Sequence, residues 1–449
     1  MTVPLPPTPD ATQEPDVRER RDLSREMGLL VAVILACAYG FTLAPTIWAG
    51  DAGELITAAY TLGVPHAPGY PTYTLLGFVA THLPIGPDIA WRLNAFTAVC
   101  GLLACMGVYR LLLKRPLHPV IAGLVALGVG AGPTFWSNSV VAEVYTLNLL
   151  MLVLFWEALA TDFRTKQFRW ITWLLAGLAC TTHETSLLPA VLGLGSFAMA
   201  LPKANRGRVW VNGLIGIIAP CSLYLYTLFA AQHSHGLVWG HPDTLASWIR
   251  FTLLPGGQQI SEGQPTDHVA YLGELLFGEG WSNLIGGTGH PAEMGLPVVL
   301  GLVGLGLHLG RKQIDPFVQY LARAAMLYVG IFLLFLHPSL ESLAKLDPYY
   351  LPVWALLWCL VPEGYYFLLG ALDRGTRLHH LRPLLKPILE MVLVLGILVT
   401  GSLSALSSNR SGDTLIRDSY TAMLHAAPQG AVLLCNFDDL FPLWYLQRV

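Results

Sequence analysis

The chain has 449 residues, of which 54% are hydrophobic and 12% are charged, with a formal net charge of −3. A soluble domain carries about twice this charged fraction, so the composition argues against an ordinary soluble protein. No basic patch of the nucleic-acid-binding type is present, and the seven cysteines lack the Cys-x-x-Cys spacing of a zinc site or a redox motif.

Residues 1–27 are rich in proline and then in charge, which predicts a disordered cytoplasmic tail. Apolar blocks of helical length follow at 28–47, 90–112, 118–134, 138–160, 170–182, 185–201, 210–231, 293–309, 319–337, 349–370 and 385–406. They predict an all-α polytopic membrane body of about 11 transmembrane helices over residues 28–406. No small-residue cleavage site follows the first block, which favours an uncleaved span over a signal peptide.

Basic residues are distributed unequally between the loops. With the N-terminus inside, 20 of the 26 Lys and Arg face the cytoplasm, all except Arg92, Arg250, Lys345, Arg410, Arg417 and Arg448. This bias predicts that the N-terminus is inside and the C-terminus outside. The outer side then holds the loops 48–89, 232–292 and 338–348 and the tail 407–449.

The outer segments contain further predicted elements. The first loop has the pattern of two interfacial helices, from Ala52 to Leu62 and from Tyr70 to about His82. The tail has a strand-like stretch from Gly430 to Cys435, followed by a helix start. It fits either the end of a short protein or the beginning of a truncated soluble domain.

Two carboxylates, Asp51 and Glu54, stand three residues apart just after the first apolar block. This spacing places both on one face of a helix, and a Pro/Gly-rich turn, residues 65–71, follows them. The simpler alternative is a helix cap, with Asp51 as the N-cap residue and Glu54 in the first turn. The functional interpretation is a carboxylate that accepts a proton from a hydroxyl group.

Cations near the outer surface are scarce, which makes Arg92, Arg250 and Lys345 candidates for contact with a lipid-linked phosphate. Arg92 has a simpler alternative, snorkelling at the interface beside Trp91. Arg250 also has one, the solvated face of an amphipathic helix over residues 245–254.

Other polar residues lie close to the predicted spans. His183 and Glu184 separate two short apolar blocks, and Glu143 lies about one turn into the fourth block. Such residues must face the protein or a cavity, which makes His183 a further candidate for substrate contact. A helix-packing hydrogen bond explains Glu143 equally well. The spacing of the outer histidines fits no standard zinc pattern, so no metal site is expected.

The string from Thr46 to Pro71, with its acid pair and its Pro-His-Ala-Pro-Gly-Tyr-Pro turn, resembles one membrane glycosyltransferase family. That family contains the lumenal protein O-mannosyltransferase acting on IPT domains of plexin-type receptors and belongs to the GT-C class. Shorter strings carry the same resemblance at 90–94, 135–145, 238–242 and 347–352. The resemblance implies that Asp51 is the catalytic base and Glu54 its partner. Within the matching strings we also expect substrate contacts from His66, Tyr70, Arg92, Glu143, Tyr145, Trp239 and Tyr349.

The resemblance implies a glycosyltransferase that moves a sugar, mannose by preference, from a polyprenyl-phosphate donor to a hydroxyl acceptor. A protein Ser or Thr is the first candidate acceptor, and a lipid or glycan is the alternative. A single displacement inverts the anomeric centre and needs no cofactor. A transporter or flippase of a lipid-linked sugar is a further alternative, but midplane charge is sparse and no repeat is visible. The short loops favour a multi-pass protein of a bacterial cytoplasmic membrane, in contact with membrane lipids and with its active site facing the periplasm.

Overall fold

The computed structural model describes residues 17–253, 296–310, 315–335, 347–373, 382–435 and 437–449. Within these ranges the secondary structure is helical, apart from an isolated parallel β-bridge between Val64 and Val238. The predicted all-α fold is therefore confirmed. The helical segments are α1 (Val17–Thr42), α2 (Ala52–Thr61), α3 (Pro71–Thr81), α4 (Ile89–Leu113), α5 (Pro119–Ala131), α6 (Pro133–Ser139), α7 (Tyr145–Thr165), α8 (Trp170–Thr182), η1 (Glu184–Ser186), α9 (Leu187–Met199), α10 (Lys203–Cys221), η2 (Ser222–Tyr224), α11 (Leu225–His233), α12 (Leu245–Leu253), α15 (Leu296–Gly310), α16 (Pro316–Phe335), η3 (Asp347–Tyr350), α18 (Leu351–Asp373), α19 (Arg382–Ser407), α20 (Leu415–Ala426) and α21 (Phe437–Arg448).

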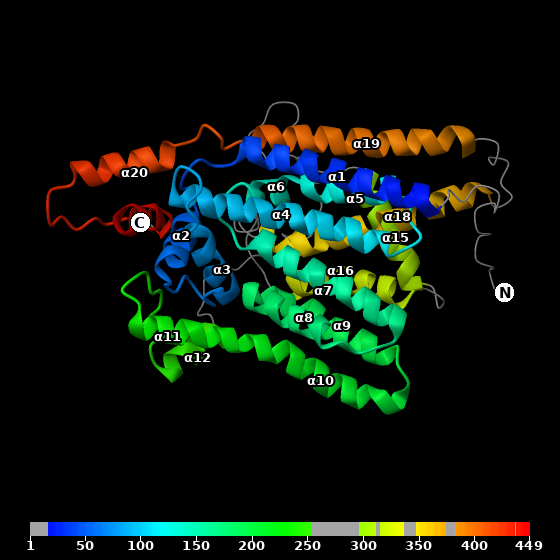
Figure 1. Ribbon diagram of the computed structural model, residues 1–449, viewed down its shortest axis with the longest axis horizontal. Coiled ribbons are helices and arrows are strands. Elements are labelled where there is room, and N and C mark those ends of the chain that lie inside the picture. The colour runs from blue at the N-terminus through cyan, green and yellow to red at the C-terminus, as the bar shows by residue number, and fades with distance from the viewer. Residues whose placement is uncertain (1–16, 254–295, 311–314, 336–346, 374–381, 436) are drawn as a thin grey trace.

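The long helices run roughly along one direction, with α1 and α19 at one edge of the bundle and α10 at the other (Figure 1). Helices α2, α3 and α21 gather at one end, which we call the α2 end, and α1 begins at the opposite end (Figure 1). Both short helices predicted in the first outer loop, α2 and α3, are therefore confirmed as elements.

Each of the eleven predicted apolar blocks overlaps a described helix. Six described helices are long and apolar enough to cross a membrane, or seven if the bent pair α5–α6 forms one span. The polytopic membrane class is thus confirmed, whereas the number of eleven spans is not. Helices α8 and α9 are shorter than a bilayer requires, as their sequences predict.

Helix α1 begins at Val17, so the prediction of a disordered tail up to residue 27 is wrong for residues 17–27. Two side chains hold this part of the helix against its neighbours. The guanidinium of Arg20 donates to the carbonyl of Leu117 at 3.1 Å, and the hydroxyl of Tyr109 donates to the carbonyl of Ser24 at 2.7 Å. Tertiary contacts therefore order a segment whose local composition favours disorder.

Two predicted spans differ in shape from the helices that replace them. The block 118–134 ends in a bend of 68° between α5 and α6 at Gly132. The block 138–160 begins with the last two residues of α6 and is helical again only from Tyr145. In the non-helical residues between the two helices, the carbonyl of Val140 accepts from the amide of Ala44 at 3.0 Å. Glu143 therefore precedes α7 and does not lie within a helical span.

The C-terminal part contains α20, an extended stretch and α21. The strand expected at 430–435 is wrong, because Val432 and Leu434 are 86% and 95% exposed and no described strand lies beside them to pair with. The helix expected after it is confirmed as α21. This helix packs against α2, where the backbone of Phe441 lies so close to Gly53 that an added Cβ would be 2.5 Å from its carbonyl oxygen.

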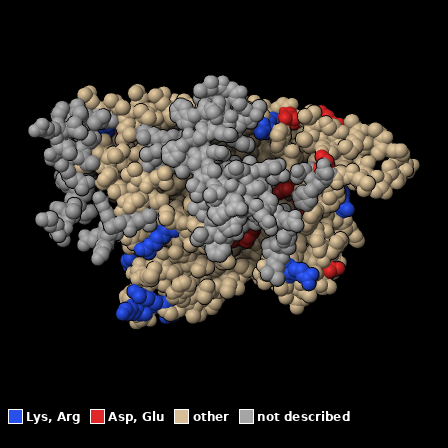
Figure 2. All heavy atoms as spheres, turned by 180° about the vertical axis from the view of Figure 1, so that it is seen from behind, with Lys and Arg blue, Asp and Glu red and all other residues tan. Residues whose placement is uncertain are grey.

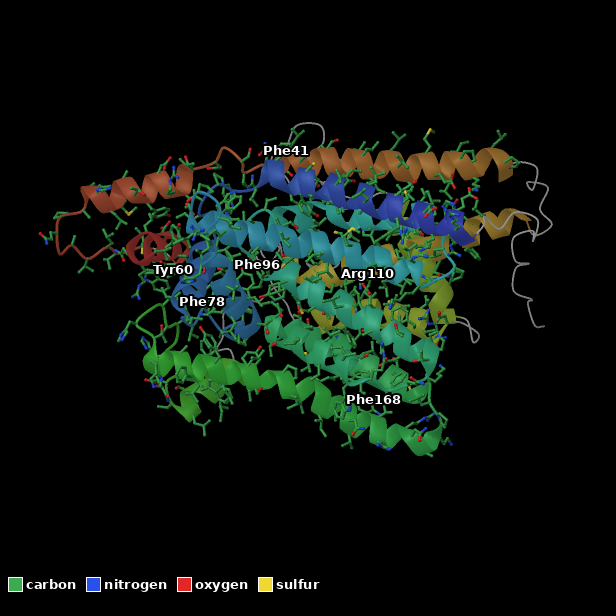
Figure 3. The ribbon with its side chains drawn as sticks, viewed as in Figure 1. Phe41, Tyr60, Phe78, Phe96, Arg110 and Phe168 are labelled. Carbon is green, nitrogen blue, oxygen red and sulfur yellow. The ribbon has the colours of Figure 1, made fainter. Side chains whose placement is uncertain are left out.

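Charge is distributed unequally along the bundle. On the face drawn in Figure 2, Lys and Arg side chains are visible at both ends of the bundle, whereas the visible acidic side chains lie over the half that contains α2. Arg110 lies toward the end of α4 that is away from Tyr60 and Phe78 (Figure 3). Its guanidinium donates to the largely buried carboxylate of Glu157 at 2.7 Å. Ion pairing thus accommodates acidic groups among the helices at that end.

Helices α15 and α18 approach each other through glycine. A Cβ built on Gly304 would lie 2.3 Å from the carbonyl oxygen of Leu360, and one built on Gly364 would lie 2.1 Å from that of Leu300. Small residues allow backbones to pack this closely inside membranes, where helix association depends on van der Waals contact.

The substitution Gly304→Ala is expected to destabilise the protein by about 1–3 kcal/mol, because the new methyl group meets a rigid backbone carbonyl. Thermal unfolding in detergent, followed by tryptophan fluorescence, measures the change. Gly306→Ala is the matched control, since Gly306 lies on the same helix and a Cβ added there would have no atom within 4 Å. Equal unfolding temperatures for the two variants would contradict the close approach of α15 and α18.

Candidate active site

Helix α2 carries the acid pair and is covered on two sides. It packs against α3 and α21, and eight of its ten residues are buried. Asp51 occupies the N-cap position, but its side chain makes no cap hydrogen bond. The alternative interpretation as a helix start is thus confirmed for the positions of Asp51 and Glu54, whereas the side-chain bond of a helix cap is absent. The carboxylate of Asp51 is 37% exposed and accessible at the α2 end of the bundle.

The turn after α2 returns the chain to the acid pair. The C-cap residue of α2 is Leu62, whose φ of 49° is left-handed, and the amide of Val64 donates to the carbonyl of Leu237 at 2.6 Å. Gly69 has a φ of +97°, a conformation that glycine adopts without steric penalty. These features bring His66 back against the first turn of α2.

Glu54 binds His66 through both of its carboxylate oxygens. One oxygen accepts from the backbone amide of His66 at 2.6 Å, and the other lies 2.7 Å from its Nδ1. On the other side of the ring, Nε2 lies 2.9 Å from the hydroxyl oxygen of Tyr70 and 3.9 Å from a carboxylate oxygen of Asp51. The histidine thus connects the two acids.

The electrostatics of the Glu54–His66 pair favour a charged histidine. Burial by itself lowers the pKa of His66, but the hydrogen bond and charge of Glu54 outweigh burial and raise that pKa to about 9. Burial raises the pKa of the Glu54 carboxyl, and the hydrogen bond to His66 opposes this effect. At neutral pH the pair is an imidazolium held by a buried carboxylate.

A cluster of rings adjoins this pair and contains four of the predicted substrate-binding residues: Tyr70, Tyr145, His183 and Tyr349. The imidazole of His183 lies 5.9 Å from the ring of Tyr70, 5.4 Å from that of Tyr145 and 5.0 Å from that of Tyr349 (centroid distances). Four separate segments, namely the 63–71 turn, α7, the α8–η1 junction and η3, therefore meet at one place.

Glu143 belongs to the same region. Burial raises the pKa of its carboxyl well above the ordinary value, and the negative charge of Asp51 adds to this effect. A carboxyl in such surroundings is a candidate for a functional role.

The basic residues that the sequence predicts to contact a phosphate have other surroundings, as far as the structure describes them. Arg92 donates from Nε to the carbonyl of Ile85 at 2.8 Å and from Nη1 to that of Thr81 at 2.9 Å, which favours anchoring of the α3–α4 connection. Arg250 is exposed on α12, whose predicted helical extent is confirmed up to residue 253. Lys345 lies outside the described residues.

Trp239 also has a different environment from the one expected. Its ring lies 6.1 Å from that of Phe441 and 5.8 Å from that of Trp444, both on α21. Its backbone amide donates to the carbonyl of Val64 at 2.8 Å. These contacts favour a role in joining α21 to the turn that carries His66.

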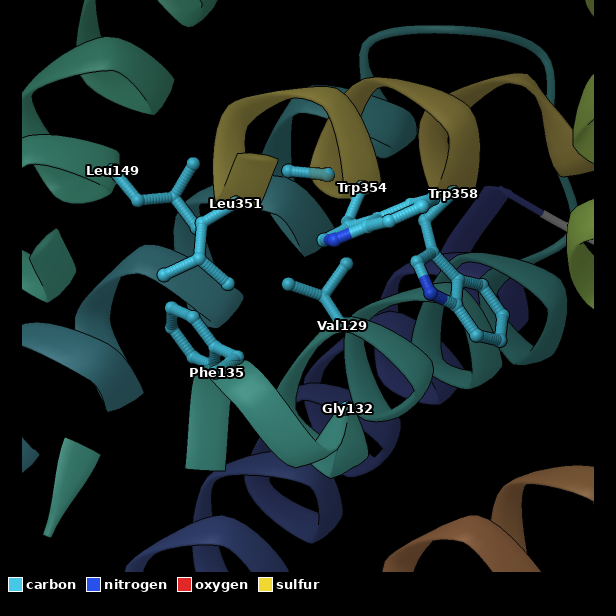
Figure 4. A pocket seen from close by; sticks show the side chains of 8 residues that line it. Val129, Gly132, Phe135, Leu149, Leu351, Trp354 and Trp358 are labelled. Atoms are coloured by element: carbon cyan, nitrogen blue, oxygen red, sulfur yellow. The ribbon is translucent and has the colours of Figure 1, made fainter. Parts of the chain in front are cut away.

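A small cavity lies between α5, α6, α7 and α18 (Figure 4). Its walls are apolar, with Phe135, Leu149, Leu351 and Trp358 among them, and its volume is about 20 Å³. A space of this size holds about one water molecule. It is too small for an isoprenoid unit as it stands.

Among the described residues, one group of side chains could hold a metal ion, namely Asp51, Glu54 and His66. Their ligand atoms all lie within 4.8 Å of one another. However, Nδ1 of His66 and a carboxylate oxygen of Glu54 are at hydrogen-bond distance, 2.7 Å. A cation would have to replace this bond. The arrangement therefore fits a hydrogen-bonded ion pair better than a preformed metal site.

Two residues that contribute to the candidate site were not identified from the sequence. Gly53 permits the close approach of α21 behind the acid pair, and the adjoining small residues Ala52 and Gly53 are the local signal for it. Thr185 binds Nδ1 of His183 through both its hydroxyl and its amide. Its position two residues after a histidine is the signal for such a side-chain turn.

Residues 51–198 match the family model described as the Protein O-mannosyl-transferase TMEM260 N-terminal domain. The chain is 24% identical over 248 residues to Protein O-mannosyl-transferase tmem260 of Dictyostelium discoideum, a match covering 50% of this chain and 30% of that protein. It is 36% identical over 141 residues to Protein O-mannosyl-transferase TMEM260 of Mus musculus, covering 29% of this chain and 20% of that protein. The matches thus span less than a third of the length of these curated relatives.

The fold resembles the crystal structure of ArnT from Cupriavidus metallidurans bound to undecaprenyl phosphate, with a TM-score of 0.60 and 12% identity over 94% of this chain and 84% of that chain. The apo structure of the same protein gives a TM-score of 0.61 at 11% identity, over 95% and 85% of the two chains. At this identity the likeness concerns the fold alone. With the sequence matches, it confirms the predicted resemblance to GT-C protein O-mannosyltransferases.

The pair Glu54–His66 predicts a pH-dependent contribution to stability. Since the folded-state pKa of His66, about 9, lies above its ordinary 6.5, the stabilisation is complete below about pH 6.5 and is lost as the pH rises through 9. The unfolding temperature of the wild type should therefore fall toward that of Glu54→Gln over this interval. Glu19→Gln, on the exposed start of α1, is the control, and an unchanged difference between wild type and Glu54→Gln across the interval contradicts the ion pair.

Proposed function

From the confirmed resemblance of this chain to GT-C protein O-mannosyltransferases, we propose that it is a glycosyltransferase of the membrane. The donor is a polyprenyl-phosphate sugar, with mannose the first candidate, and the acceptor is a protein Ser or Thr hydroxyl. The observation that carries this proposal is the carboxylate of Asp51, which makes no cap hydrogen bond, is partly exposed at the α2 end and lies 3.9 Å from a histidine that Glu54 holds. A carboxylate used only to cap α2 would accept a hydrogen bond from an amide of the first turn.

The proposed reaction is a single displacement. The acceptor oxygen attacks the anomeric carbon while Asp51 takes the hydroxyl proton. The bond between the anomeric carbon and the phosphate oxygen breaks, and the polyprenyl phosphate leaves with the electron pair. Attack opposite the leaving group inverts the anomeric centre. Asp51 contributes mainly by accepting the proton as the hydroxyl becomes acidic during bond formation.

The leaving phosphate requires compensating charge in a site that already contains several carboxyl groups. Among the described residues in contact with Asp51, His66 is the one that carries positive charge at neutral pH. A fixed cation beside a developing anion stabilises the transition state without reorganisation. We therefore assign His66 this role, in place of the expected contact with Arg92.

The proposed orientation places the α2 end outside the cytoplasm. The excess of Lys and Arg in the loops at the opposite end, which include Lys114, Lys166 and Lys203, supports it. In a bacterium, the active site then faces the periplasm, where a lipid-linked sugar presents its head group.

Asp51→Asn is expected to lower sugar transfer by at least about 10²–10⁴-fold, because the amide cannot take the acceptor proton. Incubation of the purified protein with labelled polyprenyl-phosphate mannose and candidate acceptor peptides measures the transfer. Asp22→Asn, on the exposed first part of α1, is the control for loss of one carboxylate. Near-normal turnover by Asp51→Asn would remove Asp51 from the role of base.

Dialysis against EDTA is expected to leave transfer unchanged, since Glu54 and His66 bind each other and His66 supplies the positive charge. Activity is compared before dialysis, after it, and after re-addition of Mg²⁺, Mn²⁺ or Zn²⁺. A loss on dialysis that one of these ions restores would assign Asp51, Glu54 and His66 to a metal site.

A further inference from the structure

His183 has a buried hydrogen-bond donor that none of the described residues accepts from. The residue is 1% exposed, and its Nε2 has no hydrogen-bond partner in the part of the chain that the structure describes. Nδ1 lies 3.4 Å from the backbone amide of Thr185 and 2.8 Å from its hydroxyl. Because a backbone amide can only donate, Nδ1 is the acceptor, and the proton of the neutral ring lies on Nε2.

The charge state agrees with this tautomer. Burial lowers the pKa of His183, so the ring is uncharged at neutral pH. The side chain therefore presents one N–H donor and no positive charge. Buried donors are nearly always paired in folded proteins, so an unpaired one adjoining the candidate active site calls for a ligand that accepts its hydrogen bond.

The surroundings of His183 are aromatic. Its ring is nearly parallel to that of Tyr70, at 19°, and nearly perpendicular to that of Tyr349, at 82°. Tyr145 contacts both His183 and Tyr349. Apolar ring faces combined with a few polar edges are typical of ligand sites that orient a partly polar molecule, and the C–H faces and hydroxyl groups of a sugar match this combination.

The cluster is joined directly to the groups proposed for the reaction. Tyr70 stacks on His183 while its hydroxyl oxygen lies 2.9 Å from Nε2 of His66. A sugar held against the rings therefore has its reacting end near Asp51. Tyr145 and Tyr349 are partly exposed, and they mark the side from which a ligand reaches the cluster.

We propose that Tyr70, Tyr145, His183 and Tyr349 form the sugar-recognition subsite, in which Nε2–H of His183 donates to a hydroxyl of an uncharged hexose. This inference rests on the proposed function and specifies the class of sugar that the site accepts. An ammonium group of an amino sugar has donors only and cannot accept from Nε2–H. The carboxylate of a uronic acid would meet Asp51, Glu143 and Glu184 nearby.

The subsite is tested by removing single hydroxyl groups from the sugar and by replacing the side chain of His183. The full-length protein in detergent is assayed with polyprenyl-phosphate mannose and its four monodeoxy analogues. In the wild type, one analogue is expected to lose about tenfold or more in kcat/KM, because the donor on His183 is then left unpaired. That penalty should persist in His183→Gln, whose amide nitrogen can replace Nε2–H, and disappear in His183→Phe.

His235→Phe, which replaces an exposed histidine near the end of α2, is the control and should keep the wild-type pattern. An equal penalty in His183→Phe and in the wild type would overturn the proposal. The proposal would also be overturned if a donor with a free amino group at the sensitive position supported transfer as efficiently as the mannose donor does.

A binding measurement separates this inference from the proposed function. Polyprenyl-phosphate mannose is expected to raise the unfolding temperature more than polyprenyl phosphate does, and His183→Phe should remove the additional rise. If this pattern holds but the wild type transfers no sugar, the subsite stands and the transferase function falls. If the mannosyl group adds no stabilisation and no deoxy analogue is discriminated, the subsite is wrong.

Discussion

The pairing of Glu54 with His66 is the interaction on which the candidate site depends. Glu54 is fully buried in the first turn of α2 and has both carboxylate oxygens directed at one residue of the following turn. A buried charge without such a partner is strongly unfavourable, so the pair constrains where the turn can lie. The position of the turn then sets the distances from His66 to Asp51 and to Tyr70.

The position of α2 depends on contacts from distant parts of the chain. Its rear face meets the backbone of Phe441 at Gly53, and the hydroxyl of Tyr445 donates to the side chain of Asp88 at 3.2 Å. Trp239 connects α21 to the segment that pairs with Val64. A rigid support of this kind matters because catalytic groups displaced by about an ångström lose much of their effect.

Two histidines in the same region are held in opposite states by their neighbours. A carboxylate bonds Nδ1 of His66 and favours the cation, whereas Thr185 donates to Nδ1 of His183 and burial favours the neutral ring. Such separation of similar groups by environment is a common basis for dividing roles within one site. Here it gives a charged group beside Asp51 and an uncharged donor among the tyrosines.

The sequence by itself determined the membrane class, the positions of the helices and the importance of the segment 46–71, because apolar block length and short-range motifs are local properties. It also identified Tyr70, Tyr145 and Tyr349 of the ring cluster, because these residues lie in the strings that carry the family resemblance. Only the tertiary structure decided that the side chain of Asp51 makes no cap hydrogen bond, that Glu143 precedes α7, and that Arg92 binds backbone carbonyls. These outcomes depend on which partners the fold brings within hydrogen-bond distance. No local pattern records that information, since the partners lie in distant segments of the chain.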